Sequence, residues 1–314
     1  MKIIDAATVA ARLDPARLLP ALERMFRDGC TAPTRHHHTI GVPGEPDAVL
    51  LLMPAWRAGE YLGIKLVTVF PGNSGRGLPA VSAGYLLMDG HSGAVLAMID
   101  GGELTAKRTA ATSALAARFL ARTDARTLLV LGTGRIAREL ARCHTAARPA
   151  LERVLVWGRS AAHAAAAAAD LTRDGVAAVP APELEAAIRA ADIVASATLA
   201  TEPLVRGDWV RPGTHVDLVG GYTPAMREAD DALIRKARVF ADTRDGALKE
   251  AGDLVVPIAH GALDAGAVVD LHGLCRREHP GRQSDSEVTV FKSVGAALED
   301  LAAAILVYES DGRQ

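Results

Sequence analysis

The chain contains the stretch Thr127-Leu128-Leu129-Val130-Leu131-Gly132-Thr133-Gly134-Arg135-Ile136-Ala137. An apolar run of strand length leads directly into the spacing Gly-x-Gly-x-x-Ala, and helix-forming residues continue to Ala147. Glycines permit a sharp turn and a close backbone approach to a pyrophosphate, while free N–H groups at a helix N-terminus attract that anion. In this context the motif predicts a dinucleotide site. The alternative is a tight strand-to-helix turn in an α/β domain that binds no nucleotide.

Outward from this turn, short apolar runs alternate with helical patterns. We expect strands at residues 127–131, 153–157, 176–179, 193–197, 214–219 and 239–241. The alanine run at residues 164–169 lies among strong helix formers and is interpreted as an ordinary helix. Alternation of this kind is typical of βαβ units, so the fold class is α/β with a doubly wound parallel Rossmann sheet.

The first hundred residues follow a different, α+β pattern. We expect a helix at residues 15–27, strands at 48–53, 61–70, 81–88 and 94–99, and a hairpin turn at 89–93. A helix over residues 104–121 connects the halves, and one over 294–308 closes the chain. The predicted domains are residues 1–112 with 292–314, and residues 113–291.

Composition narrows the class of partner. The 314 residues are enough for two domains, and 35 Lys plus Arg nearly balance 37 Asp plus Glu. A balanced charge gives no field toward nucleic acid or an anionic membrane, so we expect a small-molecule partner. The three cysteines form no CxxC pair, and no run of about 18 apolar residues occurs, which predicts a reducing, cytoplasmic location.

The second strand of the sheet ends in a basic segment. Trp157-Gly158-Arg159-Ser160 stands where an NAD-specific site presents an acidic residue to the ribose 2′-hydroxyl. A guanidinium and a hydroxyl suit a 2′-phosphate instead, so NADP(H) is the preferred cofactor and NAD(H) remains possible. The alternative is a solvated Arg159 at a strand end, which would leave the preference open.

Lys65 lies inside an apolar strand, in a chain with only six lysines. A buried ammonium needs a partner, which could be a substrate carboxylate, an active-site acid or a structural ion pair. Arg35 and Arg108 are further basic candidates, and converging cations would form a carboxylate clamp. Three consecutive histidines, at residues 36–38, cannot all face one ion on an extended chain, so we expect no metal.

Several stretches together resemble one known family, the ornithine cyclodeaminase and mu-crystallin family. They are Gly63-Ile64-Lys65-Leu66-Val67, Pro71-Gly72-Asn73, Gly77-Leu78-Pro79, residues 105–111, Gly132-Thr133-Gly134, Phe291-Lys292-Ser293-Val294-Gly295 and Glu299-Asp300. They occur in the expected order over essentially the whole chain. The resemblance implies a Rossmann domain beside an α+β domain through which subunits form a homodimer, with the active site in the cleft between the domains.

The resemblance also implies residue roles. Arg35, Lys65 and Arg108 would bind a substrate carboxylate, and Arg108 would contact the cofactor as well. From the motif and the strand ends we place Gly132, Thr133, Gly134, Arg135 and Ile136 at the pyrophosphate, and Gly158, Arg159 and Ser160 at the adenosine ribose. By resemblance, Ala197, Thr198 and Ser293 line the nicotinamide side.

One departure from the family pattern bears on the reaction. Cyclodeaminases carry an aspartate in a Gly-x-Asp-x-Pro-Gly-Lys segment, and Tyr222 stands at that position here. Loss of a general base costs on the order of two to four powers of ten in rate. Ketimine reductases of this family also lack the acid.

The sequence therefore favours NADPH-dependent reduction of a cyclic ketimine carboxylate. The substrate would be Δ1-pyrroline-2-carboxylate, Δ1-piperideine-2-carboxylate or both, giving L-proline or L-pipecolate, and Lys65 is the candidate catalytic residue. One alternative is an ornithine cyclodeaminase or alanine-dehydrogenase-like oxidoreductase. An alternative of another class is a ligand-binding protein of mu-crystallin type that retains NADPH without turnover.

Overall fold

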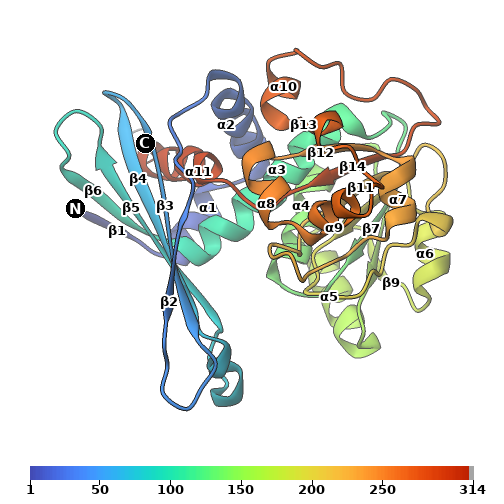
Figure 1. Cartoon of the computed structure of the whole chain (residues 1–314), viewed down its shortest axis with the longest axis horizontal. Coiled ribbons are helices and arrows are strands. Elements are labelled where there is room, and N and C mark those ends of the chain that lie inside the picture. The colour runs from blue at the N-terminus through green and yellow to red at the C-terminus, as the bar shows by residue number, and fades with distance from the viewer. Residues whose placement is uncertain (311–314) are drawn as a thin grey trace. The chain divides into compact units, whose positions relative to one another are not determined.

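The computed structural model describes residues 1–310, apart from the side chain of Ser74. The chain divides into two compact units within α3 (Gly101–Leu120). Unit 1 contains Met1–Arg108 and the chain from Ala296 onward, and unit 2 contains Thr109–Gly295. Each unit carries its own sheet (Figure 1).

Unit 2 holds a parallel sheet in the order β13-β12-β14-β11-β10-β7-β8-β9. Its strands are β7 (Thr127–Leu131), β8 (Arg153–Trp157), β9 (Ala178–Pro180), β10 (Ile193–Ser196), β11 (His215–Leu218), β12 (Arg238–Ala241), β13 (Val269–Asp270) and β14 (Thr289–Lys292). The chain runs from β7 outward through β8 and β9, then resumes at β10 on the opposite side of β7. The doubly wound fold predicted from the sequence is confirmed.

Helices connect these strands, as βαβ units require. They are α4 (Arg135–Ala147), α5 (Ala161–Arg173), α6 (Leu184–Ala190), α7 (Asp231–Lys236), α8 (Arg244–Glu250), α9 (Gly252–Ala259) and α10 (Leu271–Cys275), with short 3-10 turns η2 (Gly207–Trp209) and η3 (Ala265–Ala267). The alanine run lies in α5, as predicted. Strands β7, β10 and β11 are buried along their whole length, which explains the mostly apolar sequences of β7 and β10; β11 instead buries His215 and Asp217.

Strand β14 is the main element that the sequence analysis missed. It lies between β11 and β12 although it comes last of the eight in the chain. Its four residues, Thr289–Lys292, include a buried threonine and a buried lysine, so they form no purely apolar run. A pattern search for apolar strands therefore passes over it.

A buried polar group joins α4 to β11 inside unit 2. Asp217 Oδ1 lies 3.0 Å from His215 Nε2, and Asp217 Oδ2 lies 3.0 Å from His144 Nε2. Burial raises the pKa of Asp217, but the two histidines outweigh burial and the net shift is downward. The pair of ring nitrogens thus keeps a charged carboxylate in the core, beneath the helix that begins at the glycine turn.

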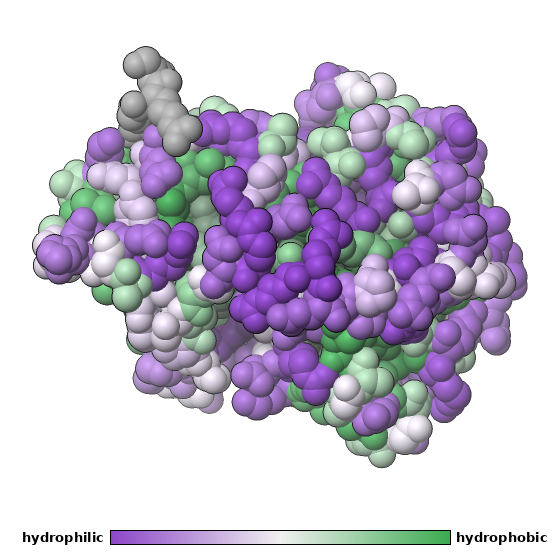
Figure 2. Space-filling view, turned by 90° about the horizontal axis from the view of Figure 1, so that it is seen from above, coloured by the Kyte–Doolittle hydropathy of each residue, from purple (hydrophilic) through white to green (hydrophobic). Residues whose placement is uncertain are grey.

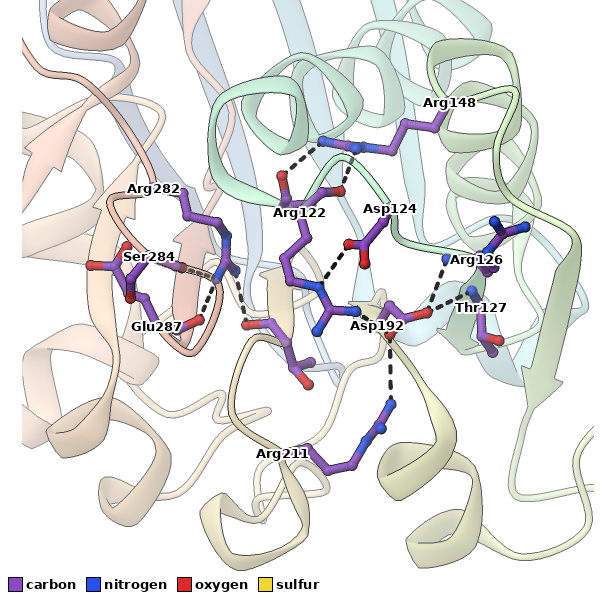
Figure 3. A network of polar contacts seen from close by, with 12 residues as sticks. Arg122, Asp124, Arg126, Thr127, Arg148, Asp192, Arg211, Arg282, Ser284 and Glu287 are labelled. Carbon is purple, nitrogen blue, oxygen red and sulfur yellow. Dashed lines mark hydrogen bonds and ion pairs between the residues drawn. The ribbon is translucent and has the colours of Figure 1, made fainter.

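A second polar network fixes the opposite, amino-terminal edge of this sheet (Figure 3). Arg122 donates to Asp124 (3.0 Å) and to Asp192 Oδ1 (3.0 Å), and Asp192 Oδ2 accepts from the backbone N–H groups of Arg126 and Thr127 at 2.9 and 3.0 Å. These contacts tie the start of β7 to the start of β10. The network is structural and leaves the carboxyl edge of the sheet free for a site.

Unit 1 is built around a sheet in the order β1-β6-β5-β4-β3-β2. Its strands are β1 (Lys2–Ile4), β2 (His36–Ile40), β3 (Ala48–Arg57), β4 (Tyr61–Val69), β5 (Val81–Asp89) and β6 (Val95–Asp100), and its helices are α1 (Ala6–Arg12), α2 (Pro15–Asp28), η1 (Pro71–Arg76) and α11 (Ala297–Glu309). Among the strands of unit 1 within residues 1–310, only β1 and β6 pair in parallel. Asp89 closes the β5–β6 hairpin by accepting from His91 N (3.0 Å) and Ser92 N (2.7 Å).

One face of this sheet is buried and the other is not. Met53, Lys65, Tyr85 and Ile99 face one another across β3 to β6 and are buried. Helix α11 packs across β3, β4 and β5 (Figure 1). The alternate residues of the same strands point to the opposite face, where they stay partly or largely exposed within the described part of unit 1, except for Ala48 at the start of β3.

The surface in Figure 2 is mostly hydrophilic, with apolar residues in small groups between charged ones. Among residues 1–310, no helix combines the length and the apolar character needed to cross a membrane.

Candidate active site

The glycine turn of unit 2 has the geometry of an anion site. Gly132 has φ +116°, and a Cβ on it would lie 2.6 Å from the Ala197 carbonyl oxygen. Gly134 differs, because a Cβ there would meet nothing within 4 Å. Gly134 is the N-cap of α4, and it supplies no side-chain acceptor to the first N–H groups of that helix. Open space beside the first N–H groups of a helix suits a pyrophosphate.

A pocket of about 420 Å³ opens at the carboxyl ends of β7, β8 and β10. This is the point where the strand order reverses, and ligands of doubly wound sheets bind there. Six predicted site residues contribute to its wall, together with six others. The lining residues are Gly132, Thr133, Trp157, Gly158, Arg159, Ala197, Thr198, Leu199, Ala200, Thr201, Glu202 and Leu204.

The β8 end of the pocket carries the basic segment. Arg159 is exposed and lines the pocket, and Gly158 has no room for a side chain because its Cβ would lie 2.7 Å from Thr133 Cγ2. Ser160 Oγ accepts from His163 N at 3.3 Å and so caps α5. The Ser160 hydroxyl can still donate its own proton to a ligand, and cationic Arg159 is its neighbour in the chain.

The β10 end of the pocket is held by a buried acid. Thr198 donates from its backbone N (2.8 Å) and from Oγ1 (2.9 Å) to Glu228 Oε1. Ser293, also predicted here, follows β14, and its hydroxyl donates to Asp242 Oδ2 at 3.1 Å. Ser293 is buried and is absent from the pocket lining described above.

Unit 1 contains a buried charge cluster of Lys65, Arg108, Glu299 and Asp300. Lys65 Nζ lies 2.8 Å from Asp300 Oδ2, and Arg108 Nε donates to Asp300 Oδ1 at 2.8 Å. Arg108 Nη1 donates to Glu299 Oε2 at 2.7 Å. Strand β4, helix α3 and helix α11 each supply part of the cluster. Its side chains are at most 4% exposed, so these charges interact with little screening by water.

Burial and neighbouring cations shift the proton equilibrium of Lys65. Burial is the largest cause of a pKa lowered to about 8; Asp300 opposes this shift, while Arg108 and Arg35 add to it. Arg35 lies just before β2 and is partly exposed. The pKa of Asp300 is lowered because the Arg108 and Lys65 charges overcome its burial. The three basic residues predicted from the sequence thus share one electrostatic environment within unit 1.

The sequence analysis required a partner for Lys65 but did not identify it. That partner is Asp300, with which Lys65 forms a buried ion pair inside unit 1. Glu299 and Asp300 were noted only as a C-terminal motif, and Glu228 was not proposed as a site residue. The signal in the sequence was a pair of adjacent acids, at positions 299 and 300, within the otherwise apolar run of residues 296–307. Tyr222 is 38% exposed in the loop after β11.

The residues present in unit 2 fit a nicotinamide dinucleotide. The glycine turn leaves space for phosphates, the pocket crosses the switch point of the sheet, and a cation marks its β8 end. Each feature comes from a different segment of the chain, so the match does not depend on the glycine motif alone.

Comparisons with known proteins agree with this geometry. Residues 3–313 match the model of the ornithine cyclodeaminase/mu-crystallin family. The chain is 43% identical to a Δ1-pyrroline-2-carboxylate reductase from Paracoccus denitrificans, covering 89% of this chain and 88% of the relative. It is 37% identical to the ketimine reductase mu-crystallin of Rattus norvegicus, covering 82% and 79%.

A solved structure shares the whole fold. It is the Δ1-pyrroline-2-carboxylate reductase of Thermococcus litoralis in complex with NADH and L-proline, with a TM-score of 0.91, 32% identity and coverage of 98% of this chain and 97% of that one. The resemblance inferred from the sequence is therefore confirmed, and the chain belongs to the ornithine cyclodeaminase/mu-crystallin family of nicotinamide-dependent oxidoreductases.

Proposed function

We propose that this protein uses NADPH to reduce a cyclic ketimine carboxylate, Δ1-pyrroline-2-carboxylate or Δ1-piperideine-2-carboxylate, to L-proline or L-pipecolate. The observation that carries the proposal is the buried cluster of Lys65 and Arg108. The pKa of Lys65 is lowered mainly by burial, and Arg108 and Arg35 add to this shift while Asp300 opposes it. A substrate carboxylate beside Lys65, Arg108 and Arg35 would give these cations a further anionic partner, so unit 1 is the proposed substrate-binding and dimerisation domain.

Lys65 is the proposed catalytic residue, while Arg35 and Arg108 orient the carboxylate. With a pKa of about 8, the Lys65 ammonium holds its proton at neutral pH and is acidic enough to share it with an imine nitrogen. Arg108 keeps its planar guanidinium fixed by two acids, which pre-orders it for a carboxylate. We also propose that Arg108 contacts the cofactor.

The cofactor supplies a hydride, and unit 2 is its proposed binding domain. Gly132, Thr133, Gly134, Arg135 and Ile136 would hold the pyrophosphate, Gly158, Arg159 and Ser160 the adenosine ribose, and Ala197, Thr198 and Ser293 the nicotinamide side. The preference for NADPH over NADH rests on exposed Arg159, which lines the β8 end of the pocket, and on the hydroxyl of Ser160, the next residue in the chain. NADH in the Thermococcus litoralis reductase supports the nicotinamide cofactor and leaves this preference to experiment.

We further propose a homodimer formed through the uncovered face of the unit 1 sheet. Pro54, Ile64, Leu86, Met98 and Ile3 form one row across that face and are partly or largely exposed. A continuous apolar surface of this kind marks an interface in a protein with balanced charge. A second copy of the same chain covers it with a matching surface.

The decisive assay follows NADPH oxidation at neutral pH with Δ1-pyrroline-2-carboxylate, and separately with pyruvate plus ammonia. Turnover of the cyclic imine alone supports the proposal. Ammonia release from ornithine with NAD would identify a cyclodeaminase despite Tyr222, and turnover of pyruvate with ammonia would identify an alanine-dehydrogenase-like enzyme. Tight NADPH binding with no turnover in any assay would identify a ligand-binding protein.

A further inference from the structure

Glu228 lies behind the pocket wall, in the loop after β11, and is fully buried. Its Oε1 accepts from Thr198 N (2.8 Å), Thr198 Oγ1 (2.9 Å) and Ser196 Oγ (2.6 Å). Its Oε2 accepts from Gly220 N (2.7 Å) and Gly221 N (3.2 Å). Backbone N–H groups can only donate, so both oxygens act as acceptors. That pattern belongs to an ionised carboxylate.

The backbone of the same segment also supports the pocket wall. The Glu228 carbonyl accepts from Leu204 N (3.0 Å) and Val205 N (2.8 Å), and Arg227 N donates to the Ala200 carbonyl at 2.8 Å. Ala200 and Leu204 line the pocket. Glu228 therefore joins three pieces of backbone: the end of β10, the loop after β11, and the wall segment at residues 200–205.

A buried ion pair lies directly beneath this junction. Asp253 Oδ1 accepts from Glu228 N (2.7 Å) and Ala229 N (3.0 Å), and Asp253 Oδ2 accepts from Lys292 Nζ (2.9 Å). A Cβ on Gly221 would lie 3.2 Å from Asp253 Oδ2 and 3.4 Å from Lys292 Nζ. All three charged side chains are fully buried. Two carboxylates thus share one ammonium, and the group carries an excess of negative charge.

The neighbouring strand adds to this charge. Asp242 follows β12, is fully buried, and accepts from Val294 N and Gly295 N at 2.7 Å each. Burial is the largest cause of a net upward shift in the pKa of Glu228; Asp253 adds to this shift, while Lys292 and the hydrogen bonds from Ser196 and Thr198 oppose it. The backbone N–H groups that donate to Glu228, Asp253 and Asp242 hold these acids as acceptors, and this geometry makes the carboxyl edge of β10, β11 and β14 an anionic environment.

We propose that Glu228 is a positioning residue for the nicotinamide half of the cofactor: it holds the loops after β10 and β11 together, and its negative charge favours the oxidised, cationic ring. This inference rests on the proposed function. Arg159 marks the adenosine end at β8, and a dinucleotide spans the switch point, so its other half lies toward β10 and β11. A reduced ring becomes a cation once its hydride, carrying both electrons of the C–H bond, has passed to the substrate carbon.

A fixed anion near that ring stabilises the charge as it develops. The environment is buried, so the interaction is weakly screened and needs no reorganisation when hydride transfer occurs. The same charge tightens binding of NADP⁺ relative to NADPH. The ratio of the two dissociation constants is therefore a direct readout of the electrostatic role, and it requires no turnover.

The experiment uses Glu228→Gln in the full-length chain. The amide group turns toward Thr198 N or the Gly220 and Gly221 N–H groups, so at least one donor loses its acceptor. We expect the Kd for NADPH to rise about threefold, and the ratio of Kd for NADP⁺ to Kd for NADPH to rise a further ~3- to 10-fold. Titration calorimetry with each form measures both values, and thermal unfolding monitors stability.

Asp230→Asn is the matched control. Asp230 Oδ1 also accepts two backbone N–H groups, from Gly207 (2.9 Å) and Leu233 (2.8 Å), but neither of these residues lines the pocket. Asp230→Asn should lower the unfolding temperature and leave the ratio of Kd for NADP⁺ to Kd for NADPH unchanged. An unchanged ratio in Glu228→Gln overturns the proposal, even if both affinities fall.

A second variant keeps the test valid if Glu228→Gln does not fold. Thr198→Val removes one hydroxyl donor to Glu228 and retains the backbone N–H, and it should weaken both cofactor forms about threefold. Wild-type affinity for both forms in this variant overturns the positioning role. If the wild-type protein binds neither NADPH nor NADP⁺, the proposed function has failed, and the result is distinguishable from a failure of this inference.

Discussion

Lys65 Nζ lies 2.8 Å from Asp300 Oδ2, and this ion pair is almost wholly enclosed by unit 1. The same carboxylate accepts from Arg108 through its other oxygen. Asp300 thereby fixes the distance between two cations that would otherwise repel each other. The cluster of Lys65, Arg108, Glu299 and Asp300 is charged and already assembled, and the proton equilibrium of Lys65 depends on burial as well as on its partners.

The first prediction concerns pH. The pKa of Lys65 is lowered to about 8, so its ammonium is present below that pH and is lost as pH rises through it. We expect kcat/KM for the cyclic imine to be flat near neutrality and to fall tenfold per pH unit above about 8.

Lys65→Met removes the titrating group and should lower kcat/KM at least ~100-fold. Lys249→Met, on an exposed position of α8, is the control and should leave the rate unchanged. A Lys65→Met enzyme within a few-fold of wild type would contradict the assigned role.

The second prediction concerns Asp300. Asp300→Asn leaves Lys65 and Arg108 buried with only Glu299 as an acid in the cluster, and breaking a buried pair in this way costs about 3–5 kcal/mol. Chemical denaturation should show that loss in the free energy of unfolding. Glu299→Gln weakens the ion pair with Arg108 and leaves the pair of Lys65 with Asp300 in place, so it should cost less. Equal losses in the two variants would argue against a central role for Asp300.

The third prediction separates two glycines of the same turn. A methyl group on Gly134 meets no protein atom within 4 Å and the residue has φ −76°, so Gly134→Ala should fold normally. It should weaken NADPH binding at least ~10-fold, because the methyl group enters the space left for the phosphates.

Gly132→Ala, unlike Gly134→Ala, should destabilise the folded protein. It places a Cβ 2.6 Å from the Ala197 carbonyl oxygen at φ +116°, which costs roughly 1–3 kcal/mol of stability. Thermal unfolding and NADPH titration of both variants test the assignment. If Gly134→Ala binds NADPH as tightly as the wild-type protein does, the pyrophosphate does not bind at this turn.

The turn that contains these two glycines illustrates which features could be predicted from the sequence alone. The turn, the strands β7 and β8, and the α/β class followed from apolar runs and glycine spacing, because those signals are local. Glu228, Asp253 and Asp300 could not be found in that way. Their partners lie 24 residues or more away in the chain, apart from the Gly220 and Gly221 contacts of Glu228, and only the assembled sheet brings them together.

The fourth prediction concerns the choice of cofactor. Arg159→Asp replaces a cation with an acid at the β8 end of the pocket, which repels a 2′-phosphate and can accept from a 2′-hydroxyl. The preference for NADPH over NADH should fall roughly 100-fold, the equivalent of about 3 kcal/mol for a charged hydrogen-bonded pair. Arg153→Asp, at the other end of β8, should leave the preference intact. Kinetics with both cofactors distinguish these results.

The fifth prediction concerns assembly. Ile64 lies at the centre of the uncovered face of the unit 1 sheet, paired with Pro54 on one side and Leu86 on the other. Light scattering should find the wild-type protein as a dimer, and Ile64→Glu as a monomer with unchanged NADPH affinity, because a carboxylate cannot be buried there without a partner. Arg24→Glu, exposed on α2, should remain dimeric. A dimer that survives Ile64→Glu would place the subunit interface on another surface of the chain.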